Sequence, residues 1–367
     1  MADAYSHSSI VDVDSLMSAV IQVIKDLCSP QFPDAGGKAA APAIEPLTMR
    51  AAFATVLDGG ASDLEIGALM TASALLEAHR AADGFTGIVL GLSDAIRDRM
   101  TPLCVDSGSA QVVVLPNYGE ESAFPAMPLL ALLLRRMGVR VLVHGAVETQ
   151  GGLHNCCVFR EFGVLPAATR GQAARQIAET GLALLPVTLF SPGLAAMLSL
   201  RNRLGVRTPA HSLANMLMPV ADTSTRSLHV LHMASWLRPS LADESVVLEA
   251  PALIVSATES AAEGILGQPW IAFRDGEVGA AWQSLFDRDS NPTPPEFAGR
   301  TPTGPALEAC DPRAWAAWTH QRLAAKAALP SHVANLLACC LYGCGYASDI
   351  NQAKAIVAIE PGSLVAA

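Results

Sequence analysis

Apolar positions in the N-terminal part of the chain recur at the spacing of an amphipathic helix. One such stretch spans 13–28, with an apolar face made of Leu16, Val20, Ile24 and Leu27. Pro, Gly and Ala dominate the segment 30–46, which is typical of a linker. Helical spacing then continues to about Met100, with Asp63 as the N-cap or first-turn residue of a helix that begins near Leu64. The pattern predicts an N-terminal extension followed by a small helical domain.

The pattern changes after Ala110, where short apolar runs alternate with helical segments. These runs are QVVVLP (111–116), VRVLVHG (139–145), ALLPVTL (183–189), SLHVLHM (227–233), PALIVSA (251–257) and WIAFRDG (270–276). Strands interleaved with helices predict a mostly parallel sheet that helices cover on both faces. The segment 285–312 is rich in Pro, Asp and Thr, and we expect a long surface excursion there.

The segment from Leu115 to Gly145 has the outline of a βαβ unit: a strand, a turn, an apolar helix and a second strand. Such units bind ligands at the carboxyl ends of their strands. Anion-binding turns need small residues, because backbone N–H groups must approach the anion. Here the turn reads Pro116-Asn117-Tyr118-Gly119-Glu120-Glu121. A proline, an aromatic ring and two carboxylates make this turn unfavourable for an anion.

Composition favours a soluble cytoplasmic protein. The chain has 367 residues, of which 51% are hydrophobic and 16% charged, with a mean hydropathy of +0.34. The longest apolar run is interrupted by Arg135 and Arg136 before it could span a bilayer, so we expect no membrane partner. Residues 1–14 have no basic region followed by an apolar core, so we expect no signal peptide.

The eight cysteines form no spaced framework for disulfides or zinc. Cys340 and Cys344 lie four residues apart on a predicted helix, where a metal pair is conceivable, but buried thiols at a helix interface are the favoured interpretation. The net charge of −10, from 24 basic and 34 acidic residues, is opposite to that of most proteins that bind phosphodiester backbones. Binding of nucleic acid would therefore require a local cluster of cations.

The order of several segments resembles that of the anthranilate phosphoribosyltransferase family, which has the glycosyltransferase family 3 fold. The matching segments are LTMRAAFATVLDGGASDLEIGALMTASALLEAH (47–79), LFSPGLAAMLSLRNRLGVRT (189–208) and LPSHVANLLACCLYGCGYASDINQAKAIV (329–357). The motifs LPNYG, VLVHG, AHSL and GCGYA are more similar to those of a divergent branch of paralogues, which are described as nucleic-acid binders. The resemblance covers roughly Glu45 to the C-terminus.

The resemblance implies an α/β fold of the nucleoside phosphorylase/phosphoribosyltransferase type, with a helical N-terminal domain and a larger α/β domain around a mostly parallel central sheet. We expect an extension and linker over 1–45, a helical domain over 46–107 joined by about 189–204, and an α/β domain over 108–367. It also implies a homodimer through the N-terminal helices. Their apolar positions exceed what a small domain needs inside, and include Leu57, Leu64, Ile66, Leu69, Met70, Leu75 and Leu76.

Family members hold a phosphoribosyl diphosphate with Mg²⁺, and this chain departs from their motifs at four places. The glycine-rich turn keeps only Gly119 as a small residue, and the Lys-His-Gly-Asn run keeps only His144 and Gly145. The serine-rich diphosphate loop is replaced by 147–154, and the Asp-Glu metal pair is reduced to Glu259, a weak metal candidate. By contrast, Arg201, which by resemblance recognises the acceptor carboxylate, is retained.

These losses favour a non-catalytic binding protein without a cofactor. Candidate ligand-binding residues are Asn117, Tyr118, Gly119, His144, Gly145, Arg201 and Arg207. Candidate residues for weak, non-specific nucleic-acid binding, expected to border one cleft, are Arg80, Arg135, Arg136, Arg201 and Arg203. His144 could instead be a structural histidine, Glu259 a solvated carboxylate, and the arginines a cover for a helix end.

Two further functions stay open. One is an active phosphoribosyl or glycosyl transferase with altered anion and metal anchors, which would use Mg²⁺. The other is an enzyme with an unrelated substrate, or a protein-interaction module formed by the helical domain.

Overall fold

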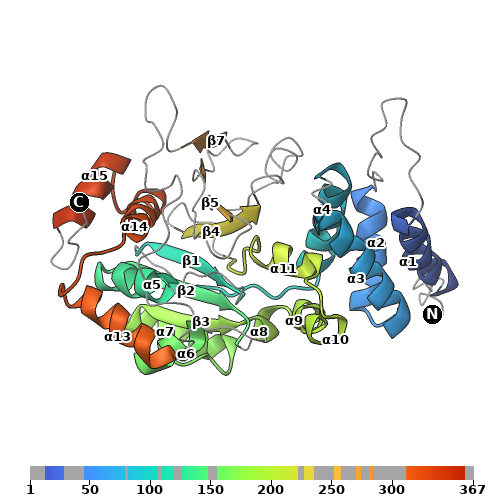
Figure 1. The fold of residues 1–367 in the computed structure, drawn as a ribbon, viewed down its shortest axis with the longest axis horizontal. Coiled ribbons are helices and arrows are strands. Elements are labelled where there is room, and N and C mark those ends of the chain that lie inside the picture. Colours follow the sequence, from blue (N-terminus) through green and yellow to red (C-terminus); the bar gives the residue numbers. More distant parts are fainter. Residues whose placement is uncertain are drawn as a thin grey trace, which may run out of the picture. The chain divides into compact units, whose positions relative to one another are not determined.

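The chain forms two compact units, which are labelled by element in Figure 1. The first, the helical unit, contains Met1–Arg99 and Ala196–Leu213; the second, the sheet unit, contains Met100–Ala195 and Ala214–Ala367. The computed structural model describes residues 13–28, 45–78, 82–105, 110–118, 126–147, 155–221, 227–234, 252–257, 270–273, 281–284 and 311–359.

Helices α1 to α4 account for most of the helical unit, and α10 joins them from later in the chain. Their bounds are Val13–Cys28 (α1), Pro46–Leu57 (α2), Asp63–Ala78 (α3), Ala82–Arg97 (α4) and Arg201–Leu204 (α10). The helix predicted over 13–28 is thus confirmed with the same bounds, and it packs on α2 and α3. The chain passes between the units through α9 (Pro192–Ser199) and α11 (Pro209–Ala214).

Local sequence explains where these helices begin and how closely they pack. Pro46 stands at the start of α2, where its missing N–H leaves no helical hydrogen bond unmade. Ser62 and Glu65 form a capping box for α3, because the Ser62 N–H donates to Glu65 Oε2 at 2.7 Å and the Glu65 N–H donates to Ser62 Oγ at 3.3 Å. Gly91 of α4 lets α2 approach closely, since a Cβ there would lie 2.5 Å from the Cβ of Met49.

The sheet unit contains a seven-stranded sheet in the order β3-β2-β1-β4-β5-β6-β7. The strands are Val112–Asn117 (β1), Arg140–Gly145 (β2), Leu182–Pro186 (β3), Ser227–Ala234 (β4), Ala252–Ala257 (β5), Trp270–Phe273 (β6) and Ala281–Ser284 (β7). The pairs from β3 to β5 are parallel, whereas β6 and β7 are antiparallel. The mostly parallel sheet and the six predicted strands are confirmed, and the short β7 had no prediction.

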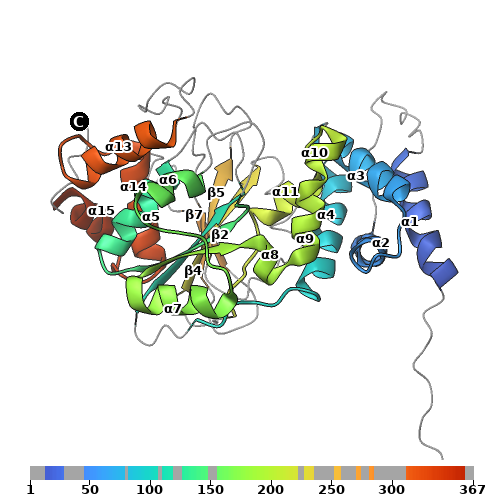
Figure 2. The same ribbon diagram turned by 90° about the horizontal axis from the view of Figure 1, so that it is seen from below.

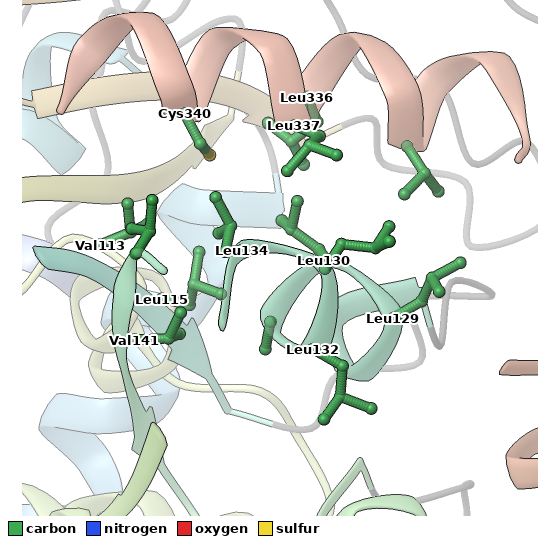
Figure 3. Packing of buried hydrophobic residues seen from close by; sticks show 14 of the residues in the cluster. Val113, Leu115, Leu129, Leu130, Leu132, Leu134, Val141, Leu336, Leu337 and Cys340 are labelled. Carbon is green, nitrogen blue, oxygen red and sulfur yellow. The ribbon is translucent and has the colours of Figure 1, made fainter. Parts of the chain in front are cut away.

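Both faces of the first strands are buried. Val113 and Leu115 belong to the main core, and Val112 and Val114, which point to the opposite face, are buried as well. The main core lies between these strands and the helices α5 (Ala126–Arg136) and α14 (Ser331–Gly343). Figure 3 shows Leu336 and Leu337 of α14 facing the leucines of α5, with Val113, Leu115 and Val141 of β1 and β2 beside them. The apolar run after Leu115 is therefore a core helix.

The described residues of the sheet unit form five further helices: α6 (Asn155–Glu161), α7 (Arg170–Thr180), α8 (Val187–Phe190), α13 (Pro312–Leu323) and α15 (Ile350–Ile359). Helix α7 packs on β2 and β3, with Thr169 as its N-cap and Gly181 in the left-handed conformation at its end. The helices α13 to α15 gather beside α5 and α6 (Figure 2). Cys339, Cys340 and Cys344 are buried in this region, which confirms the expectation of core thiols.

The bounds of the units differ from the sequence prediction. The helical unit ends at Arg99 instead of 107, and the segment that joins it is Ala196–Leu213 instead of about 189–204. The reason is hydrogen bonding within the sheet unit. The Thr101 N–H donates to the Phe190 carbonyl at 2.8 Å, and the Leu103 N–H donates to that of Pro219 at 2.8 Å. The end of the segment predicted over 46–107 and the start of the segment predicted over 189–204 therefore belong to the sheet unit.

Most of the predicted linker and of the surface excursion, 29–44 and 285–310, lie outside the described residues. None of the helices in the described ranges combines the length and the apolar character that crossing a membrane requires.

Candidate functional site

The carboxyl ends of β1 and β2 meet in very close contact. Asn117 pairs with Gly145, and the Ala146 N–H donates to the Asn117 carbonyl at 3.0 Å. A Cβ at residue 145 would lie 1.7 Å from that carbonyl oxygen, so only glycine fits there. The two halves of the predicted βαβ site, Asn117-Tyr118 and His144-Gly145, are therefore brought together as expected from the strand order.

Tyr118 and His144 form a buried pair at this edge. The Tyr118 hydroxyl and His144 Nδ1 are 2.9 Å apart, and both side chains are less than 5% exposed. The two rings meet edge to face at a centroid distance of 5.4 Å. The Phe190 ring packs on His144 in the same manner at 5.8 Å. Tyr118 and His144 are thus partners of each other in the interior.

Burial keeps both members of the pair uncharged. It lowers the pKa of His144 to about 3, and His229 and His232 of β4 lower it in the same direction. Burial likewise raises the pKa of Tyr118 well above its usual value. His144 is therefore a neutral imidazole at physiological pH, with one nitrogen as a donor and the other as an acceptor.

The side chain of Asn117 is also engaged within the protein. Its oxygen Oδ1 accepts a hydrogen bond from Asn155 Nδ2 at 2.9 Å, and its Nδ2 donates to Cys156 Sγ at 3.6 Å. The Cys156 thiol in turn donates to the Ala146 carbonyl at 3.8 Å. Burial raises the pKa of Cys156 to about 12, so the thiol stays protonated. Asn155 and Cys156 were not among the sequence candidates, because nothing local marks residues that α6 brings to the edge.

Three of the candidate arginines belong to the helical unit. We call Arg201 and Arg203 of α10, together with Arg207 in the following loop, the arginine cluster. Arg203 forms an exposed ion pair with Asp63 at 2.8 Å, and Arg207 Nη2 donates to Ser212 Oγ at 3.4 Å. The positive charges of Arg207 and Arg201 help burial to lower the pKa of His211 to about 4.

The expectation that all candidate arginines border one cleft is wrong for Arg135 and Arg136. They end α5, directly before β2 begins at Arg140, and thus lie at the amino edge of the sheet. Tyr118 and His144 lie at the carboxyl edge. Arg136 Nη1 donates to the Leu323 carbonyl at 2.7 Å, where it complements the end of α13.

Several candidates lie outside the described residues, namely Arg80, Gly119, Glu120, Glu121 and Glu259. Within the described ranges, no group of three His, Cys, Asp or Glu side chains is placed to hold a metal ion.

The fold and the βαβ edge define a phosphoribosyltransferase-like α/β protein, and comparison with known proteins agrees. The structure of anthranilate phosphoribosyltransferase from Thermus thermophilus matches with a TM-score of 0.63 and 20% identity, covering 93% of each chain. The enzyme from Saccharomyces cerevisiae, solved in complex with PRPP and Mg, matches with a TM-score of 0.61 and 12% identity over 92% of each chain.

Sequence relatives show the same resemblance. The uncharacterized protein YbiB of Escherichia coli (strain K12) is 28% identical over 316 residues, which are 84% of this chain and 92% of that protein. Anthranilate phosphoribosyltransferase of Geobacillus thermodenitrificans (strain NG80-2) is 28% identical over 174 residues, 47% of each chain. The chain thus spans about half the length of that enzyme in the alignment. No protein-family model matches. The resemblance to the anthranilate phosphoribosyltransferase family is confirmed.

Replacing Tyr118 with Phe tests the buried pair. The change leaves His144 Nδ1 without its partner in the interior, and we expect a loss of about 1–3 kcal/mol in the free energy of unfolding. Tyr346→Phe is the matched control, because Tyr346 is 38% exposed and its replacement should change stability little. Chemical denaturation of both variants measures the difference. Equal stabilities would contradict the proposed pairing.

His144 also predicts an acid dependence of stability. The pKa of His144 lies near 3 in the folded protein and near 6.5 in the unfolded chain. As the pH falls below 6.5, the unfolded state gains a proton that the folded state does not accept, so stability decreases down to about pH 3. His144→Gln should flatten this slope, and His211 and His232, with pKa values of about 4, should keep part of it. An unchanged slope in denaturation curves across this range would exclude a neutral, buried His144.

Proposed function

We propose that this chain is a non-catalytic binding protein built on the phosphoribosyltransferase fold. The observation that carries the proposal is the Tyr118–His144 hydrogen bond at the carboxyl edge of β1 and β2. A transferase needs donors at this edge that face a diphosphate. Here the polar side chains of Tyr118, His144 and Asn117 bond to protein groups instead. Neutral groups that already have partners offer little stabilisation to a bound anion.

The first experiment tests for activity. Purified protein supplied with anthranilate and phosphoribosyl diphosphate should give no product, with or without Mg²⁺. Each family motif for diphosphate or Mg²⁺ that this chain lacks would have stabilised the transition state. A loss of ~1.4 kcal/mol of this stabilisation lowers the rate tenfold. Magnesium-dependent turnover that disappears in Arg201→Ala would instead establish the alternative, an active transferase with altered anion and metal anchors.

As the ligand we propose nucleic acid, bound weakly and without base specificity. Guanidinium groups suit phosphate oxygens, and the arginine cluster supplies three of them within seven positions, from Arg201 to Arg207. The net charge of −10 limits the long-range attraction, so contacts must come from such a local cluster. Affinity should fall steeply between about 50 mM and 200 mM salt, because bound phosphates release counterions.

A titration of single-stranded DNA at about 50 mM salt, followed by fluorescence anisotropy, measures this binding. Arg201→Ala should weaken it. Arg135→Ala is the matched control, since Arg135 is an exposed arginine at the amino edge of the sheet and should leave the affinity unchanged. Absence of any complex for the unaltered protein would reject the nucleic-acid proposal and favour a small-molecule or protein ligand.

We further propose a homodimer through the N-terminal helices. Leu69 and Met70, which were expected to contribute to this surface, are buried inside the helical unit. Other leucines support the proposal, because Leu64 and Leu75 of α3 are 83% and 56% exposed and Leu47 of α2 is 68% exposed. Large apolar side chains at such exposure are commonly covered by a second subunit.

Light scattering tests the dimer. The unaltered protein should have about twice the mass of one 38.3 kDa chain at micromolar concentration, and Leu64→Asp combined with Leu75→Asp should reduce it to a single chain. Leu165→Asp provides the control, because Leu165 is equally apolar and 54% exposed but belongs to the sheet unit. A single-chain mass for the unaltered protein would exclude the dimer.

A further inference from the structure

One carboxylate of the helical unit lies where a carboxylate is least favoured. Glu77 is the penultimate residue of α3, at the end of the helix where the macrodipole is negative. The side chain is also partly buried, and this burial raises the pKa of the Glu77 carboxyl. Both effects disfavour the ionised form of the Glu77 carboxyl. A glutamate at this position therefore does not stabilise α3.

The groups around Glu77 are those that bind an anion. The Ser212 hydroxyl, on α11, donates a short hydrogen bond to Glu77 Oε1. Arg207 Nη2 donates to the same hydroxyl oxygen, and the charge of Arg207 lowers the pKa of Glu77, in opposition to burial. The Ser212 hydroxyl thus links the Glu77 carboxylate to the Arg207 guanidinium, although Glu77 and Ser212 are 135 residues apart in the chain.

Residues next to Ser212 show that the positive charge is concentrated here. Arg201 and Arg207 both lower the pKa of His211, the neighbour of Ser212. His211 Nδ1 lies 3.3 Å from both the N–H and the carbonyl oxygen of Thr208, and the ring is neutral at physiological pH because burial lowers its pKa to about 4. The ring is therefore held in place without adding charge, and the guanidinium groups provide the attraction for an anion.

We propose that Glu77 is an internal carboxylate occupying an anion site formed by Arg207 and Ser212. The ligand class is a small carboxylate, which matches Glu77 in shape and charge. As long as Glu77 is ionised, the site is filled by the protein itself. Removing the charge of Glu77 opens the site to an external carboxylate. The inference concerns the helical unit alone and does not depend on nucleic-acid binding.

Saturation-transfer NMR with acetate as the probe tests this proposal at pH 7.5 and constant ionic strength. Glu77→Gln should bind acetate saturably, at least tenfold more tightly than the unaltered protein, because the amide keeps the size of the side chain and removes the competing charge. Adding Arg207→Ala to this variant should abolish the gain. Asp63→Asn is the matched control, since it removes an exposed carboxylate of the same helix, leaves Glu77, Arg207 and Ser212 in place and should bring no gain.

A purely structural role for Glu77 predicts a different result. Glu77→Gln would then be less stable in denaturation experiments and would bind no acetate, and this outcome would overturn the proposal. Acetate binding of equal strength in the unaltered protein would overturn it as well, because the site would not be blocked. Glu77→Met replaces Glu77→Gln if circular dichroism finds the latter unfolded, since methionine has similar length and high helix propensity.

Discussion

Burial of the parallel sheet is the constraint on which the rest of this structure depends. Parallel strands linked by helices must be covered, and the apolar residues of β1 and β2 are buried accordingly, with α5 and α14 over one face. Each buried Val or Leu contributes about 1.5–3 kcal/mol, whereas one hydrogen bond at the edge contributes about 1 kcal/mol. The fold therefore depends on the core and tolerates large changes of chemistry at the strand ends.

The carboxyl edge of the sheet illustrates this tolerance. The ends of β1 and β2 lie very close together there, because Gly145 lets β2 approach Asn117 as closely as the strand pairing requires. The side chains, however, turn inward. Tyr118 and His144 bond to each other, and Asn117 bonds to residues of α6. The polar side chains at this edge are thus bonded within the protein, and burial holds His144 neutral.

In the helical unit, carboxylates of α3 partly balance the positive charge of the arginine cluster. The arginine cluster is a local excess of positive charge in a chain whose net charge is −10, and α3 supplies carboxylates against it from both of its ends. Asp63 pairs with Arg203 at the surface, where solvent screens the interaction. Glu77 is partly buried and bonds to Ser212, and a charge in such a site is screened less by solvent than the charge of Asp63. The proposed anion site is built on the second contact.

The sequence by itself determined the periodic features of this protein. Helix α1, six strands, the core thiols and the meeting of Asn117-Tyr118 with His144-Gly145 follow from patterns within one element or one βαβ unit. Only the tertiary structure decided which side chains become partners. The Tyr118–His144 bond, the link from Asn155 to Asn117, the Glu77–Ser212 contact and the separation of Arg135 from the carboxyl edge were not predicted. Periodicity reports the solvent exposure of each element, whereas side-chain partners depend on how strands are ordered and helices packed, which no local pattern encodes.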